Sequence, residues 1–120
     1  MTFIDPTIAT TAAVECALWS TADEDGNLDA TYTGSDLAPE TLENLAMDVT
    51  LFIEENLDDL QASGLSAGQI GHDFILTRNH HGAGFWDRGL EEALGNRLTD
   101  ACDPYGSFDL YVGDDNRLYA

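Results

Sequence analysis

The chain has 120 residues, and its 23 aspartates and glutamates are accompanied by four arginines and no lysine, which gives a formal net charge of −19. The length is that of one domain, and a hydrophobic content of 43% excludes a disordered acidic tail, so residues 1–120 are predicted to form a single folded acidic domain. The charge excludes direct binding to nucleic acid or to anionic membranes, because both would repel the protein.

The predicted elements begin with a helix over residues 5–20, where Pro6 suits a first helical turn. A polar connection follows over residues 21–38. The longest helix is predicted over residues 39–62, because Pro39 suits its start and apolar residues recur at spacings of three and four.

From residue 69 onward the pattern indicates strands and turns around one further helix. The expected strands are residues 70–77, 84–87, 107–112 and 117–119, and the expected helix covers residues 90–103. This order predicts an α+β fold, with a small antiparallel sheet of three to four strands and about three helices packed on one face.

We expect no signal peptide, because residues 1–5 lack a basic region, and no apolar run is long enough to span a membrane. The two cysteines, Cys16 and Cys102, are too few for a disulfide framework and fall on apolar helical faces. We therefore expect free, buried thiols in a cytoplasmic protein.

The helix over residues 39–62 is predicted to carry a stripe of seven acids. These are Glu40, Glu43, Asp48, Glu54, Glu55, Asp58 and Asp59. Over roughly 30 Å of helix they give one charge per about 4 Å, close to the one per about 3.4 Å of a single DNA strand. Like charges four residues apart, and acids near the end of a helix, both cost stability, so a merely solvated face rarely combines them.

The connection before this helix supplies a second candidate row of acids. It consists of Asp23, Glu24, Asp25, Asp29 and Asp36. We predict that both rows bind a partner protein in a basic groove that otherwise holds nucleic acid.

Salt adaptation and calcium binding would also account for acids in this chain, and both hypotheses stay open. Adaptation to a salt-rich cytoplasm explains the missing lysine, but it predicts evenly spread acids, whereas residues 1–60 hold 14 acids and no base and residues 61–120 hold nine acids and four arginines. For calcium, residues 23–29 offer oxygen ligands, although the run lacks the full spacing and the bidentate glutamate of an EF-hand loop.

The histidines His72, His80 and His81 lie near acids but match no zinc motif, and a structural role is favoured for the last two, which lie in a turn bounded by glycines. A metal-dependent enzyme is the least favoured hypothesis, and we predict no catalytic residue, metal or cofactor. The arginines are expected to pair with acids nearby in the sequence, such as Asp87, Glu91 or Asp115. Trp86 is interpreted as a packing residue, with an anchor for a partner as the alternative.

One long string resembles a motif of small acidic proteins that bacteriophages and prophages encode. It covers residues 72–88, with the sequence HDFILTRNHHGAGFWDR. Similar shorter segments are residues 17–20 (ALWS), 38–42 (APETL), 97–99 (RLT), 105–106 (YG) and 109–115 (DLYVGDD). Residues 21–36 match least, so no role for their acids follows from the resemblance.

The resemblance implies a phage setting rather than a mechanism, because the function of that family is mostly unassigned. Phages benefit when they block the host defence enzymes that bind DNA. Together with the charge, this predicts an inhibitor in the host cytoplasm, a monomer or homodimer, whose partner is a CRISPR effector or a restriction enzyme. The inference to these partners comes from charge and setting, not from the motif.

Overall fold

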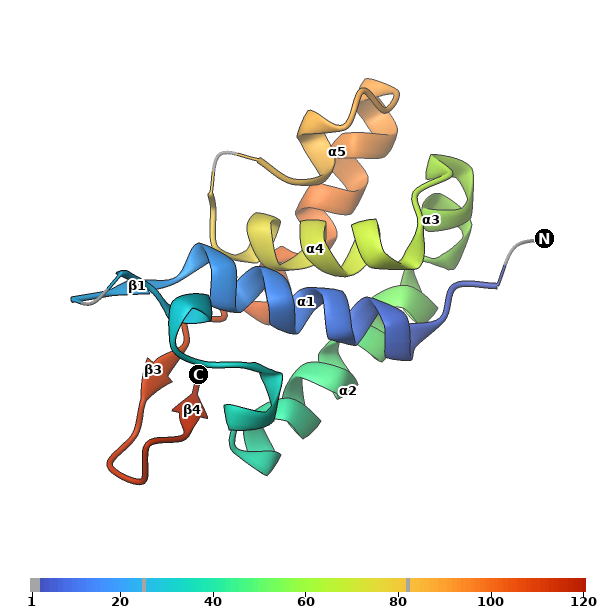
Figure 1. Cartoon of the computed structure of the whole chain (residues 1–120). Coiled ribbons are helices and arrows are strands. Elements are labelled where there is room, and N and C mark those ends of the chain that lie inside the picture. The colour runs from blue at the N-terminus through green and yellow to red at the C-terminus, as the bar shows by residue number, and fades with distance from the viewer. Residues whose placement is uncertain (1–2, 25, 82) are drawn as a thin grey trace.

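The computed structural model describes residues 3–24, 26–81 and 83–120. Within these ranges the fold is α+β and dominated by helices (Figure 1). The α-helices are α1 (Pro6–Ser20), α2 (Pro39–Glu55), α3 (Leu57–Ser63), α4 (Ala67–Arg78) and α5 (Glu92–Ala101). The strands form two antiparallel pairs, β1 (Ala22–Asp23) with β2 (Gly26–Asn27) and β3 (Tyr111–Val112) with β4 (Leu118–Tyr119).

Helices α1 and α4 lie side by side at the centre of the molecule (Figure 1). Each has a side-chain cap, since Asp5 accepts a hydrogen bond from the Thr7 amide at 2.9 Å and Ser66 accepts one from the Gln69 amide at 3.1 Å. Gly71 permits the close approach, because a Cβ atom there would overlap the backbone carbonyl of Ala9. The α1–α4 pair therefore depends on small residues at its crossing.

An aromatic cluster joins α2 to α4 and to the C-terminal segment. The Phe52 ring lies 4.6 Å from that of Phe74 and 5.6 Å from that of Phe85, measured between centroids. Tyr105 meets Phe74 edge-on at 5.2 Å. All three phenylalanines are buried, so this cluster is the centre of the hydrophobic core.

The α+β class is confirmed, but the expected sheet of three to four strands is wrong. Residues 70–77 belong to helix α4, and residues 85–87 form a 3₁₀ turn, so no hairpin joins them. The segment from Ile70 to Arg78 is buried on almost every side. A helix without an exposed face has no amphipathic period, and its β-branched residues then imitate a buried strand.

The expected long helix over residues 39–62 is interrupted. Helix α2 ends at Glu55 and α3 begins at Leu57, and the Asn56 side chain donates to the Phe52 carbonyl at 2.9 Å, where the chain bends. The predicted start at Pro39 is confirmed. Helix α5 is also confirmed, somewhat shorter than expected.

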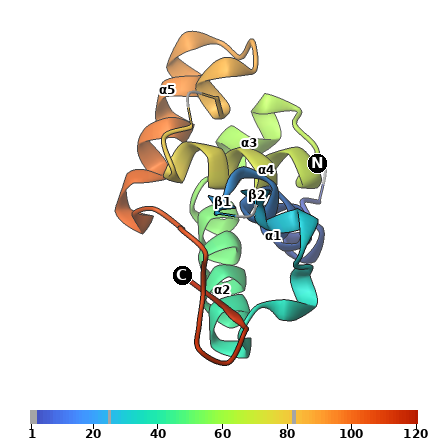
Figure 2. The same ribbon diagram turned by 60° about the vertical axis from the view of Figure 1, so that its left-hand side comes forward.

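The C-terminal hairpin is confirmed over a shorter length than expected. Strands β3 and β4 pair Tyr111 with Tyr119 and Val112 with Leu118. The Ala38 amide donates to the Leu118 carbonyl at 2.9 Å, which fixes the hairpin beside the start of α2 (Figure 2). In the preceding connection, residues 28–30 and 34–36 form 3₁₀ turns.

Both cysteines are free and buried, as predicted. None of the helices in the described ranges combines the length and the apolar character needed to cross a bilayer.

Candidate functional site

Five of the seven acids predicted on α2 and α3 are exposed to solvent. These are Glu40, Glu43, Glu54, Glu55 and Asp58. The other two are half-buried and form ion pairs with arginines of the same chain. Asp48 Oδ2 lies 3.2 Å from Arg78 Nη1, and Asp59 accepts two hydrogen bonds from Arg97, at 3.0 and 3.1 Å. These hydrogen bonds tie the Asp59 carboxylate to α5, and they lower the pKa of Asp59.

The exposed acids form two groups rather than one unbroken stripe. Glu40 and Glu43 lie at the start of α2, whereas Glu54, Glu55 and Asp58 lie around the bend between α2 and α3. Between the groups, the side chains of Met47 and Leu51 are 69% and 48% exposed. The outer face of α2 is therefore apolar in the middle and acidic at both ends.

The acids of the preceding connection also divide. Asp23, Glu24 and Asp29 are exposed, while Asp36 accepts a hydrogen bond from the Thr33 amide at 2.8 Å and caps a 3₁₀ turn. Asp25 lies outside the described residues, so the predicted calcium alternative falls partly there. In the part of the chain that the structure describes, no three His, Cys, Asp or Glu side chains gather as metal ligands would.

The arginines pair with distant acids, so the expectation of local pairing is wrong for three of the four. Arg78 pairs with Asp48, Arg88 with Asp73 and Arg97 with Asp59. These pairs join α4 to α2, the loop after α4 back to α4, and α5 to α3. Because these three arginines pair with acids of the same chain, most of the surface charge that a partner would meet is negative.

The molecule is elongated, with extents of 42, 25 and 22 Å. A net charge of −19 along 42 Å corresponds to one charge per about 2.2 Å. Duplex DNA carries one charge per about 1.7 Å of its axis. The whole molecule thus approaches the axial charge density of a duplex, which the α2 stripe alone does not.

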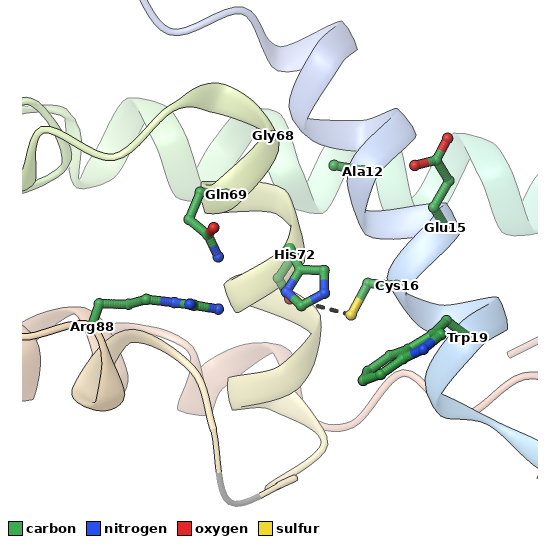
Figure 3. Close-up of a pocket in the computed structure, with 8 residues that line it drawn as sticks. All are labelled: Ala12, Glu15, Cys16, Trp19, Gly68, Gln69, His72 and Arg88. Carbon is green, nitrogen blue, oxygen red and sulfur yellow. Dashed lines mark hydrogen bonds between the residues drawn. The ribbon is translucent and has the colours of Figure 1, made fainter.

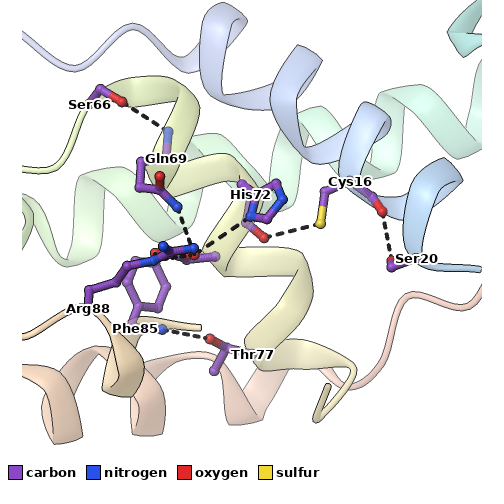
Figure 4. Close-up of polar contacts among 9 residues, drawn as sticks. Cys16, Ser20, Ser66, Gln69, His72, Thr77, Phe85 and Arg88 are labelled. Carbon is purple, nitrogen blue, oxygen red and sulfur yellow. Dashed lines mark hydrogen bonds and ion pairs between the residues drawn. The ribbon is translucent and has the colours of Figure 1, made fainter. Parts of the chain in front are cut away.

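A hollow of about 560 Å³ lies between α1 and α4 (Figure 3). Its polar lining consists of Glu15 and Trp19 from α1, Gln69 and His72 from α4, and Arg88 from the following loop. Beside it lies Asp73, which is fully buried. Its carboxylate accepts hydrogen bonds from Arg88 Nε and Nη2, the shortest at 2.7 Å, and from Gln69 Nε2 at 3.0 Å (Figure 4).

The thiol and the carboxylate nearest to this hollow both form hydrogen bonds within the protein. The Cys16 thiol donates to the backbone carbonyl of His72 at 3.5 Å rather than to its imidazole. Burial raises the pKa of Cys16 to about 11, so the protonated thiol, a poor nucleophile, prevails at neutral pH. Both oxygens of the Asp73 carboxylate accept hydrogen bonds, Oδ1 from Gln69 and Arg88 and Oδ2 from Arg88. His72 Nδ1 lies 3.8 Å from Asp73 Oδ1, beyond hydrogen-bonding distance.

Polar residues of the 72–88 string that sequence reasoning did not single out hold the fold together. Thr77 Oγ1 accepts from the Phe85 amide at 3.3 Å. Asn79 both donates to the Phe108 carbonyl, at 3.1 Å, and accepts from the Phe108 amide, at 2.7 Å. His80 and His81 are exposed beyond the end of α4, and Trp86 is 53% exposed, so it does not pack into the core as expected.

The long string is therefore explained largely by scaffolding contacts around α4. A signal for α4 was present in the sequence, since Ser66 followed by Gln69 is the pattern of a helix capping box. No protein-family model, curated protein or solved structure matches this chain.

Proposed function

We propose that this protein is an inhibitor that imitates the charge of nucleic acid and occupies the DNA-binding groove of a bacterial defence complex, a CRISPR effector or a restriction enzyme. The observation that carries the proposal is the axial charge density, one net charge per about 2.2 Å against about 1.7 Å for duplex DNA. The resemblance to phage proteins supplies the setting.

The placement of the arginines supports the same proposal. A protein that needed charge only for solubility would require a net charge of about 2–8 and would mix both signs on its surface. In this chain three of the four cations lie in ion pairs with acids of the same molecule. A basic groove would therefore meet little repulsion from this surface.

The direct test is competition with DNA. Labelled duplex DNA is bound to members of a panel of CRISPR effector complexes and restriction enzymes, and the protein is added at increasing concentration. Displacement from at least one member, weakening steeply as salt rises, is the expected result. No displacement from any member of the panel would refute the proposal.

The acids around the α2–α3 bend are expected to contribute more than acids elsewhere. The triple variant Glu54→Gln, Glu55→Gln, Asp58→Asn should inhibit at least tenfold less well. The slope of log affinity against log salt concentration should be smaller in magnitude by up to about 3, one for each lost ionic contact.

The matched control neutralises three exposed acids on or beside α5, with the changes Glu91→Gln, Glu92→Gln and Asp100→Asn. Both variants have the same net charge. Equal losses in the two would show that only total charge matters and that the bend is no special contact.

Salt adaptation is the second candidate, because exposed acids also occur on the C-terminal elements, among them Glu92, Asp109 and Asp114. The two candidates differ at low ionic strength. We expect the chain to give the circular dichroism spectrum of a folded helical protein at about 0.01 M salt, where the Debye length is about 30 Å. A chain that is unfolded there and folds only near 1 M salt would favour salt adaptation.

A further inference from the structure

An apolar groove runs along one side of α2. It combines two neighbouring hollows of about 380 and 470 Å³, which share Thr50 and Glu54 in their linings. We call this combined surface the α2 groove. The first hollow adds Phe3, Ile4, Ile53 and Leu57, and the second adds Met47 and Leu51.

The α2 groove exposes several large apolar side chains on a protein that is otherwise highly charged. Phe3 is 80% exposed, Met47 69% and Leu51 48%. Thr50 adds little polarity, because its hydroxyl donates to the Ala46 carbonyl of the same helix at 2.8 Å. A contiguous exposed apolar patch rimmed by polar residues marks an interaction site.

The charges at the ends of the α2 groove decide what can occupy it. Glu43 lies one turn before Met47, Glu54 lies within the groove, and Glu55 follows it. Residues 1–60 contain no basic residue. If a second copy packed its α2 against this one, Glu43 of each copy would meet acids of the other in either orientation, and like charges would repel. An occupant must therefore bring its own cations.

We infer that the α2 groove receives a cationic amphipathic helix of the partner protein. The inference rests on the proposed function and adds to it the part of the partner that is recognised. The groove follows α2 and α3 from Met47 to Leu57, roughly 15 Å. This length suits apolar anchors at positions i, i+3 or i+4, and i+7 of a bound helix, with lysine or arginine beside the acids at each end.

Apolar contacts in the α2 groove would supply salt-resistant affinity and selectivity, which contacts between charges do not. Contacts between exposed charges are weakened by salt and discriminate poorly among basic proteins. Side chains in a desolvated centre carry most of the energy of a protein interface. Binding through the α2 groove should therefore keep affinity at physiological salt and select one basic partner over others.

The test uses the full-length protein and two synthetic peptides of the same composition, leucine and lysine, each of about 15 residues. In one the leucines repeat at helical spacing, and in the other they are scattered. Affinities are measured by fluorescence anisotropy at about 0.15 M salt. We expect the amphipathic peptide to bind at least tenfold more tightly than the scattered one.

The variant Met47→Gln, Leu51→Gln should bring the amphipathic peptide to the affinity of the scattered peptide and leave the scattered one unchanged. Glutamine keeps the helix propensity of α2, and both positions are exposed, so the fold is retained. Trp86→Gln is the matched control, because it removes an exposed apolar side chain outside the α2 groove and should have no effect.

Equal affinity for both peptides, or no effect of the double variant, would overturn the inference. So would a concentration-dependent dimer, seen by analytical ultracentrifugation, that the double variant abolishes, since a second copy would then fill the α2 groove. These outcomes leave the proposed function standing if the protein still displaces DNA from its target. Failure of DNA displacement with intact peptide selectivity would instead refute only the proposed function.

Discussion

Replacing Arg78 with methionine is expected to lower the free energy of unfolding by about 2–4 kcal/mol. The Arg78 side chain is almost fully buried, and its guanidinium donates to the carbonyls of Gly106 at 2.8 Å and Tyr105 at 3.0 Å. A hydrogen bond from a charged group contributes about 1.5–3 kcal/mol, and water can replace part of it because Gly106 is exposed. The remaining loss is a large share of the free energy of unfolding of a typical protein, which is about 5–15 kcal/mol.

Aromatic rings around Arg78 add to the expected loss. Its Cζ atom lies 5.1 Å from the ring centroid of Phe74 and 5.4 Å from that of Phe108, so a cation–π attraction disappears with the charge. Methionine has similar length and helix propensity, so the variant reports mainly on the lost charge and hydrogen bonds.

The control for Arg78 is Arg97→Met. Arg97 also forms an ion pair between two helices, but its side chain is 56% exposed, and exposed pairs contribute little. Both variants are compared by urea denaturation followed by circular dichroism. Similar losses in the two would show that the buried contacts of Arg78 do not stabilise the fold as argued.

Gly71→Ala adds a single methyl group, yet it is expected to lower the free energy of unfolding strongly. The added Cβ would overlap the Ala9 carbonyl, which belongs to the backbone of α1 and cannot rotate away. Ala9 is fully buried, so α1 would have to move away from α4 as a whole. Overpacking of this kind costs about 1–3 kcal/mol, and occasionally more, which thermal or urea denaturation would detect.

Gly68→Ala on the same helix is the matched control. Its Cβ would meet only the Ser66 hydroxyl oxygen, at 4.0 Å, which is an ordinary contact. Since alanine favours helix over glycine by up to about 1 kcal/mol, this variant should be neutral or more stable than the parent. A loss of stability at Gly68 as large as that at Gly71 would contradict the close α1–α4 contact.

The hairpin near the C-terminus and three helices could be predicted because each has a local signal. Pro6 and Pro39 mark helix starts, and α5 has a clear apolar face. Helix α4 has little such signal, since its neighbours cover it on almost every side and its pattern resembles a buried strand. Packing partners that are distant in the sequence decide its conformation.

The candidate site was predictable in composition but not in arrangement. The sequence identifies the acids, but it does not reveal that Asp48 and Asp59 accept hydrogen bonds from arginines 30 and 38 residues away. It also does not reveal the α2 groove, because Phe3 and Leu57 are brought together only by the packing of α1 and the residues before it against α2. Such long-range pairs depend on the tertiary fold.

The burial and ion pairing of the arginines affect how a protease can cleave the chain. A protease that cleaves after lysine or arginine finds only four sites in the chain. Arg78 is buried at the end of α4, and Arg88 and Arg97 are held in ion pairs. Cleavage after Arg78 requires α4 to open, so its rate reports directly on local unfolding of the central helix.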